Sequence, residues 1–207
     1  QPLGVEGANQ AAAEKIRLLK LDGIDATVQQ KVVPDVTLYM SSSRGVVQAM
    51  DAETGRMRWA TPVGRSDYLT TELAATDDMV ALVNGQNIFI LRADDGSLIE
   101  QRRIVGGAPA AGPAIAGTTM FVPTLSGQLH AYRFGPQAPR WPEIYYSKGT
   151  VRFAPTAVGH HIMWPTDHGI ITAIDPGRPG AKFRLLLEDP IAGPLVYSPP
   201  TQMLAVT

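Results

Sequence analysis

The chain has 207 residues, of which 44% are hydrophobic and 18% are charged, so it can bury the core of a globular domain and does not resemble a disordered tail. Its 18 basic and 19 acidic residues give a formal net charge of −1, which leaves no basic excess for binding a nucleic-acid backbone. The absence of cysteine excludes disulfides, cysteine-ligated metal sites and a thiol nucleophile.

The first 23 residues carry two competing signals. Residues 6–14 are rich in alanine, which favours a short helix. Residues 16–23, however, align with residues 57–64 at an offset of 41, so that Leu18 matches Trp59 and Gly23 matches Gly64. This alignment predicts that residues 1–23 contain the outer strand of a preceding repeat, or form a short extension, and that an inner strand follows near residues 27–33.

A period of about 41 residues runs through the rest of the chain. Two series of equivalent positions show it: Ala49, Ile90, Ala131 and Ala173, and, ten residues later, Trp59, Glu100, Trp141 and Phe183. Turn signals interrupt the pattern every eight to twelve residues, and apolar runs with helical spacing are absent. Such a period is typical of a β-propeller blade of four antiparallel strands.

The repeat predicts an all-β propeller in which the whole chain, 1–207, is a single partial domain. We expect four repeats, at about 24–64, 65–106, 107–148 and 149–190, and the start of a further blade at 191–207. The expected strands are 36–42, 46–51 and 57–61; 70–74, 79–83, 87–92 and 97–104; 113–116, 119–124, 128–133 and 140–146; 153–158, 161–165, 170–174 and 182–187; and 193–197 and 203–207.

Two organisations of the chain ends remain open. The first outer strand and the last two inner strands could form a fifth blade that lacks one strand and closes the ring. The alternative, which we prefer, is a fragment of a larger propeller, because the sequence stops within an apolar strand.

Residues 36–64 show the repeat most sharply, with Ala49 and Asp51 ending one strand, Gly55 in the turn and Trp59 in the next strand. This pattern resembles the pyrroloquinoline-quinone-like (PQQ-like) β-propeller repeat family, and weaker forms cover residues 78–106, 119–141 and 161–183. The structural repeat positions are Ala49, Asp51, Gly55, Trp59, Gly96, Ala131, Trp141, Ala173, Asp175 and Phe183. We expect the tryptophans to pack between blades, Asp to accept N–H bonds across its turn, and a looser junction where Glu100 replaces Trp.

Resemblance to the quinoprotein dehydrogenases would imply PQQ, a calcium ion, a catalytic Asp and an adjacent cysteine pair. The chain has no cysteine and no acidic cluster with calcium-loop spacing, so we expect no PQQ, no calcium and no other cofactor or metal, and we assign no catalytic residue. Asp94-Asp95-Gly96 and Asp77-Asp78 occupy turn positions and are interpreted as turns.

Five further groups of residues are candidate sites. The pair His160-His161 falls in a turn, where we expect solvated side chains, and His130 is expected to pack within a strand. Asp167 and His168 could form a polar pair at a loop tip, but sequence shows no nucleophile beside them. The aromatic segment 141–146 is expected to pack between outer strands, with a contact patch as the alternative, and Arg102-Arg103 is too short a basic segment for nucleic acid.

Three functions remain open. The first is a non-catalytic scaffold that binds a protein partner through propeller loops. Similar propellers include the lipoprotein that assists insertion of β-barrels into the bacterial outer membrane, and this resemblance implies the periplasm or cell envelope. The alternatives are a fragment of a quinoprotein oxidoreductase and a sensor domain. We expect no nucleic-acid partner and no transmembrane segment, and a lipid anchor on the parent chain would not be visible in this sequence.

Overall fold

The computed structural model describes residues 5–27, 35–178 and 180–206. The chain divides into two compact units, one formed by Gln1–Leu38 and Met50–Arg58, the other by Tyr39–Ala49 and Trp59–Thr207. We describe each unit by itself.

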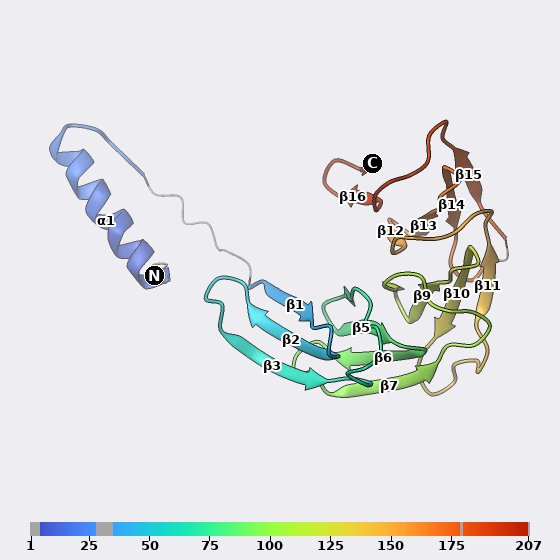
Figure 1. The fold of residues 1–207 in the computed structure, drawn as a ribbon. Helices are drawn as coiled ribbons and strands as arrows, with labels where there is room; N and C mark the ends of the chain where they lie inside the picture. The colour runs from blue at the N-terminus through green and yellow to red at the C-terminus, as the bar shows by residue number, and fades with distance from the viewer. Residues whose placement is uncertain (1–4, 28–34, 179, 207) are drawn as a thin grey trace. The chain divides into compact units, whose positions relative to one another are not determined.

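The first unit contains the only helix among the described residues, α1 (Val5–Leu21) (Figure 1). It includes the expected helix at 6–14, whereas the strand expected at 16–23 is wrong. Alanine, glutamate, lysine and leucine dominate the segment, and all four are strong helix formers. The amides of Gly23 and Ile24 bond to the carbonyls of Lys20 and Leu19, and Gly23 has a φ of 74°, which completes a Schellman cap. The strand expected at 27–33 lies almost wholly outside the described residues.

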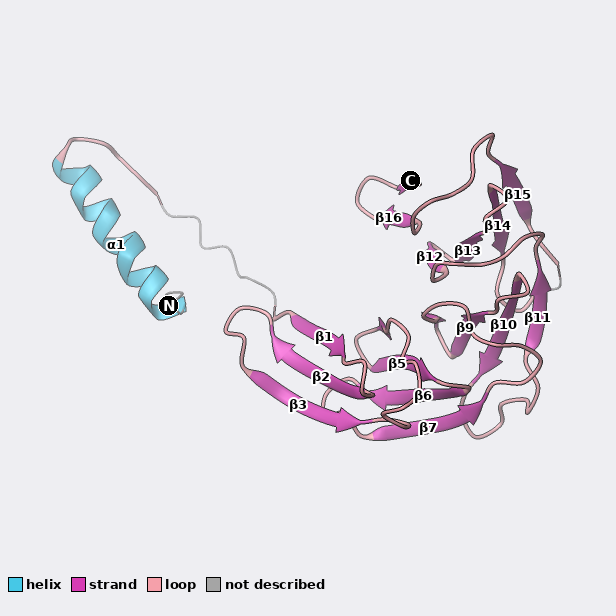
Figure 2. Cartoon of the chain, viewed as in Figure 1, coloured by secondary structure: helices cyan, strands magenta, loops and turns pink. Residues whose placement is uncertain are grey.

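All other elements are strands (Figure 2). The first sheet is β1 (Thr37–Ser41), β2 (Val46–Asp51) and β3 (Met57–Pro62); the second is β4 (Ala74–Ala75), β5 (Met79–Asn84), β6 (Asn87–Arg92) and β7 (Leu98–Arg103). The third is β8 (Ala114–Ala116), β9 (Thr119–Pro123), β10 (Gln128–Arg133) and β11 (Glu143–Tyr146); the fourth is β12 (Thr156–Val158), β13 (His161–Pro165), β14 (Ile170–Ile174) and β15 (Phe183–Leu186). The last is β16 (Val196–Ser198) and β17 (Met203–Ala205).

The strands within each sheet are paired in chain order, and those of the three four-stranded sheets are antiparallel, as a propeller blade requires. Successive sheets of the second unit follow one another along an arc (Figure 1). The predicted all-β propeller class is therefore confirmed.

The cores of the second unit lie between successive sheets. Val80 and Leu82 of β5 face a cluster that contains Trp59, whereas Ala81 and Val83 face the next sheet, where they meet Met120 and its neighbours. Because side chains alternate along a strand, β5 must be apolar at each of its first five positions to fill both interfaces. The central strands of the following two sheets are likewise buried on both faces at almost all of their inner positions.

Trp59 fills the interface between the first two sheets. Its side chain is buried, and its indole Nε1 donates a hydrogen bond of 2.9 Å to the carbonyl oxygen of Ala93. The ring centroid of Tyr39 lies 5.9 Å away. Position 59 thus takes the role that the repeat pattern predicts for its tryptophan.

Trp141 does not take this role, and the expected packing between outer strands is wrong for it. Its side chain is 65% exposed, while Tyr145 is the buried aromatic residue of β11. The pairing register explains the difference: Ile90 pairs with Glu100 and Ala173 with Phe183, but Ala131 pairs with Glu143. The loop before β11 delays that strand by two residues, so Trp141 precedes it instead of lying within it.

Asn84, at the end of β5, anchors the connection that enters the second sheet. Its side-chain amide donates to the Arg65 carbonyl at 3.0 Å and to the Thr70 hydroxyl at 2.9 Å, and its carbonyl accepts the Arg65 amide at 2.9 Å. Asn84 is 1% exposed, so its loss would leave these groups without their hydrogen-bond partner.

Replacing Asn84 with alanine is therefore expected to lower the free energy of unfolding by about 2 kcal/mol. Urea unfolding followed by circular dichroism measures the change. Asn87→Ala is the matched control, because no side-chain bond is found for Asn87 in the described structure, and it should cost less than about 1 kcal/mol. Equal losses in the two variants would contradict the anchoring role.

In the first unit, Asp51 closes the turn between β2 and β3. One carboxylate oxygen accepts the amide and hydroxyl of Thr54, each at 2.8 Å, and the amide of Glu53 at 3.1 Å; the other receives Arg58 at 2.9 Å. Arg58 also contacts Asp35. The bonds from Thr54, followed by that from Arg58, lower the pKa of Asp51 from 3.8 to about 2.

This pKa predicts the pH dependence of the turn. Because the folded pKa lies below the unfolded value, ionised Asp51 stabilises the turn above pH ~4, and this contribution is lost as pH falls toward about 2. A carbon-detected NMR titration of the Asp51 carboxyl should give a midpoint near 2 in the native protein, and Thr54→Val should move it upward. A native midpoint near 3.8 would contradict the bonding shown.

Candidate functional site

A polar clamp lies where the repeat replaces its tryptophan by Glu100. Arg102 of β7 donates to the carbonyl oxygens of Arg133 at 2.7 Å and Pro139 at 3.0 Å, and it contacts the Glu100 carboxylate. Glu100 in turn accepts the Gly135 amide at 3.1 Å. The looser junction expected at Glu100 is therefore wrong: charge-assisted bonds hold the loop between β10 and β11 against β7.

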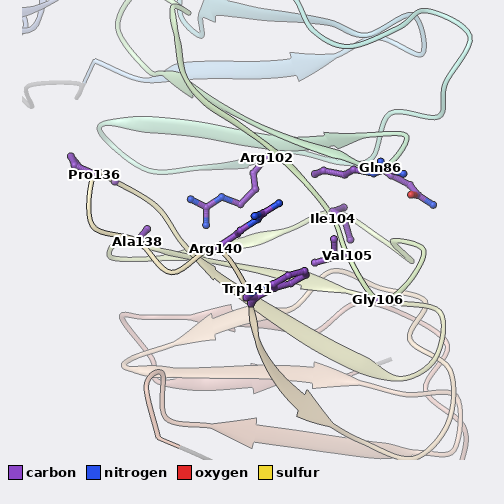
Figure 3. Close-up of a pocket in the computed structure, with 11 residues that line it drawn as sticks. Gln86, Arg102, Ile104, Val105, Gly106, Pro136, Ala138, Arg140 and Trp141 are labelled. Atoms are coloured by element: carbon purple, nitrogen blue, oxygen red, sulfur yellow. The ribbon is translucent and has the colours of Figure 1, made fainter.

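The clamped loop borders an open cavity of about 790 Å³, which we call the rim groove. Its walls are the end of β7, the segment Ile104–Gly106 and the loop from Gly135 to Trp141 (Figure 3). Trp141 also lines a smaller cavity of about 320 Å³, together with Arg133 and Glu143. Trp141 thus borders two hollows.

The rim groove is cationic. Arg102, Arg103 and Arg140 line it, and none of its lining residues is acidic. Glu100 compensates Arg102, but no salt bridge to Arg103 or Arg140 is found within the described ranges. The Arg140 guanidinium lies 5.7 Å from the centroid of the Trp141 ring, within cation–π range, and Figure 3 shows the two side chains next to each other.

This arrangement suits binding to protein rather than covalent chemistry. Trp and Arg are enriched among the residues that dominate the binding energy of protein interfaces, where they fill hollows of the partner surface and the surrounding contacts exclude water. Trp141 and Arg140 are both exposed and form a pair of this type. The sequence had singled out segment 141–146 and Arg102-Arg103 separately, and the structure brings them to one groove.

The structure also brings His161 and Asp175 into contact, although the sequence analysis did not connect them. The Nδ1 of His161 lies 2.5 Å from the Asp175 carboxylate, and the Lys182 ammonium lies 3.4 Å from the same carboxylate. Burial acts to raise the pKa of Asp175, but the bonds from His161 and Lys182 outweigh it and lower that pKa. The expectation of a solvated histidine pair is therefore wrong for His161, which begins β13 and ties it to the end of β14.

The remaining titratable candidates have structural positions. Asp167 accepts the Thr150 amide at 2.7 Å, which lowers its pKa, and the imidazole of His168 lies 3.9 Å from it. His130 is fully buried in β10, its Nε2 is 2.9 Å from Gln128, and burial lowers its pKa.

The acidic turn at Asp94-Asp95 has a structural role. The Asp95 carboxylate accepts the Ser97 amide at 2.8 Å, which lowers its pKa and closes the turn at Gly96. In the ranges that the structure describes, no three His, Cys, Asp or Glu side chains gather closely enough to hold a metal ion. Within the same ranges no helix has the length and hydropathy needed to span a bilayer.

Comparison with known proteins points to one family. A family model described as outer membrane protein assembly factor BamB matches residues 9–133. The protein of that name from Yersinia pestis is 24% identical to this chain over 115 residues, which cover 51% of this chain and 29% of the relative.

Solved structures share the fold. BamB from Moraxella catarrhalis superposes with a TM-score of 0.61 at 18% identity, over 84% of this chain and 56% of that one. The β-propeller domain of Cps50 (Swd1) from Myceliophteria thermophila gives 0.69 at 14% identity, over 82% and 57%, and the computationally designed protein Ika8 gives 0.61 at 13% identity, over 80% and 51%. The chain thus spans a little over half of each structure and less than a third of the Yersinia relative.

Proposed function

Because the chain belongs to the outer membrane protein assembly factor BamB family, we propose that it is a non-catalytic scaffold of the bacterial cell envelope that binds a protein partner in the periplasm. The observation that carries the proposal is the exposed Trp141, which borders two hollows and has Arg140 over its ring. Binding of a partner would bury this ring, which is 65% exposed, together with the Arg140 guanidinium, and buried Trp and Arg side chains are prominent among the residues that dominate interface affinity.

Site-specific photocrosslinking in the native bacterium tests this function. The intact parent protein would carry a photoreactive amino acid at position 141, with position 146 as the matched control, because Tyr146 is similarly exposed at 61% on the same sheet. We expect a crosslink from position 141 to a component of outer-membrane protein assembly, absent from position 146. Equal labelling from both positions, or a cytoplasmic location of the protein, would overturn the proposal.

The proposal includes the absence of quinone chemistry, which a titration checks. The intact parent protein is mixed with PQQ and calcium, and its absorbance and thermal unfolding are recorded. A ligand that binds only the native state, at 100 times its Kd, would add about 2.7 kcal/mol of stability. We expect no spectral change and no shift of Tm, and a shift accompanied by dye-linked alcohol oxidation would favour the oxidoreductase.

A further inference from the structure

The rim groove has a charge that the chain as a whole lacks. The chain carries a formal net charge of −1, yet three arginines line this cavity and no acidic residue does. Glu100 compensates Arg102, which leaves the charges of Arg103 and Arg140, both exposed, for a ligand. Clustered charge of one sign in a concave surface attracts the opposite charge and discriminates against partners of like charge.

The groove is also held in shape before any ligand arrives. Arg102 and Glu100 fix the loop at three backbone positions, Arg133, Gly135 and Pro139. Pro136, Pro139 and Pro142 further restrict the same loop, because each proline fixes its own φ. A surface ordered in advance loses less conformational entropy on binding, so more of the contact energy appears as affinity.

The groove combines cationic side chains with an aromatic ring, and this combination favours a protein segment over a small anion. A phosphate or carboxylate ion would use Arg103 and Arg140 but would leave the Trp141 ring uncovered. An extended segment places carboxylates and apolar groups at successive residues, and it can therefore contact the arginines and the indole together. We infer, on the basis of the proposed function, that the rim groove binds an extended, acidic segment of the partner protein, with Trp141 as its apolar anchor.

Binding of a defined probe tests this inference. The probe is a fluorescein-labelled peptide with the sequence Glu-Asp-Pro-Phe repeated three times, and its counterpart has lysine at every acidic position. Fluorescence anisotropy with the intact parent protein should show binding of the acidic peptide, weakened at least about tenfold when salt rises from 50 to 500 mM. Binding of the lysine peptide with equal affinity, or of neither peptide, would overturn the inference.

Variants locate the binding. Two changes in the groove should each weaken the affinity for the acidic peptide at least about tenfold. They are Trp141→Ala and the double charge reversal Arg103→Glu with Arg140→Glu. Their matched controls are Tyr146→Ala, and Arg44→Glu with Lys148→Glu, which change an equally exposed aromatic residue and the same total charge; these should stay within about twofold. All four proteins should retain the native circular dichroism spectrum and Tm. Controls that weaken binding as much as the groove variants would overturn the assignment.

Two further measurements separate the inference from the proposed function. If inorganic phosphate displaces the peptide at concentrations where chloride does not, the groove is a simple anion site and the inference fails. If position 141 crosslinks to an assembly component in cells but the labelled segment, identified by mass spectrometry, lacks acidic residues, the scaffold function stands and the acidic segment is wrong. An acidic segment at the crosslink would support both the scaffold function and the acidic-segment inference.

Discussion

Replacing Trp59 with alanine is expected to lower the free energy of unfolding by about 3–5 kcal/mol, the range for truncating a buried aromatic residue. Trp59 fills the space between two sheets, where Val47, Val80 and Leu91 belong to the same buried cluster. Its truncation leaves a cavity and also removes the bond to the carbonyl of Ala93. Urea unfolding followed by circular dichroism measures the loss, and hydrogen exchange of the amides of β5 and β6 should locate it.

Two further variants test whether the loss comes from the packing of Trp59 between the sheets and not merely from replacing a tryptophan of the repeat. Trp59→Phe keeps most of the apolar volume and should cost no more than about 2 kcal/mol, mainly for the lost hydrogen bond and the smaller ring. Trp141→Ala removes the same side chain from the exposed repeat position and should change stability by less than about 0.5 kcal/mol. Similar losses at positions 59 and 141 would mean that both tryptophans pack between sheets, contrary to the structure.

The contrast between these two tryptophans shows where sequence spacing stops being informative. The period of about 41 residues predicted the order and class of the sheets because the central strands are apolar on both faces, a signal that burial in a propeller imposes. The period counts residues along the chain, however, and not the pairs they form. The loop after β10 is longer than its equivalents, so the strand partner of Ala131 is Glu143 while Trp141 is left in the loop.

In the N-terminal segment, the period predicts a strand where the structure has a helix. Residues 16–23 align with a later strand, and this alignment predicts a strand where local propensity favours a helix. The glycine that completed the match, Gly23, has a positive φ as Gly64 does, but it terminates a helix. Alanine and the other helix formers along Val5–Leu21 are the stronger physical signal, because helix propensity is a free-energy preference of each residue. A match of a few residues to a later strand is not an interaction and stabilises nothing.

Part of the candidate site was visible in the sequence. Glu100 and Arg102 are two residues apart, so a strand places both on one face, and a Glu in place of an apolar anchor could have been interpreted as one half of an ion pair. The acceptors of Arg102 could not have been found, because the carbonyls of Arg133 and Pro139 lie 31 and 37 residues away along the chain. The contact between His161 and Asp175 likewise depends on the pairing of β13 with β14.

Replacing Gly127 with alanine is expected to lower the free energy of unfolding by about 3 kcal/mol or more, through two separate costs. Gly127 lies in the tight turn between β9 and β10 with a φ of 78°, a conformation that disfavours any residue with a Cβ. A Cβ there would also overlap the carbonyl oxygen of Gly149, on the segment leaving β11. Because that oxygen belongs to the backbone, relieving the overlap would require the connection between the third and fourth sheets to move.

Gly117→Ala isolates the first cost, the backbone strain, so that the difference between the two variants measures the cost of the overlap. Gly117 has a φ of 56°, but a Cβ there would meet nothing within 4 Å, so this variant should lose only about 1–2 kcal/mol from backbone strain. Urea unfolding of both variants measures the difference, and hydrogen exchange should show that Gly127→Ala exposes the amides of β9, β10 and β11. Equal losses would mean that the turn glycine is needed only for its conformation. A larger loss at Gly127 would show that the turns between the second and third strands also set how closely one sheet's connection approaches the next.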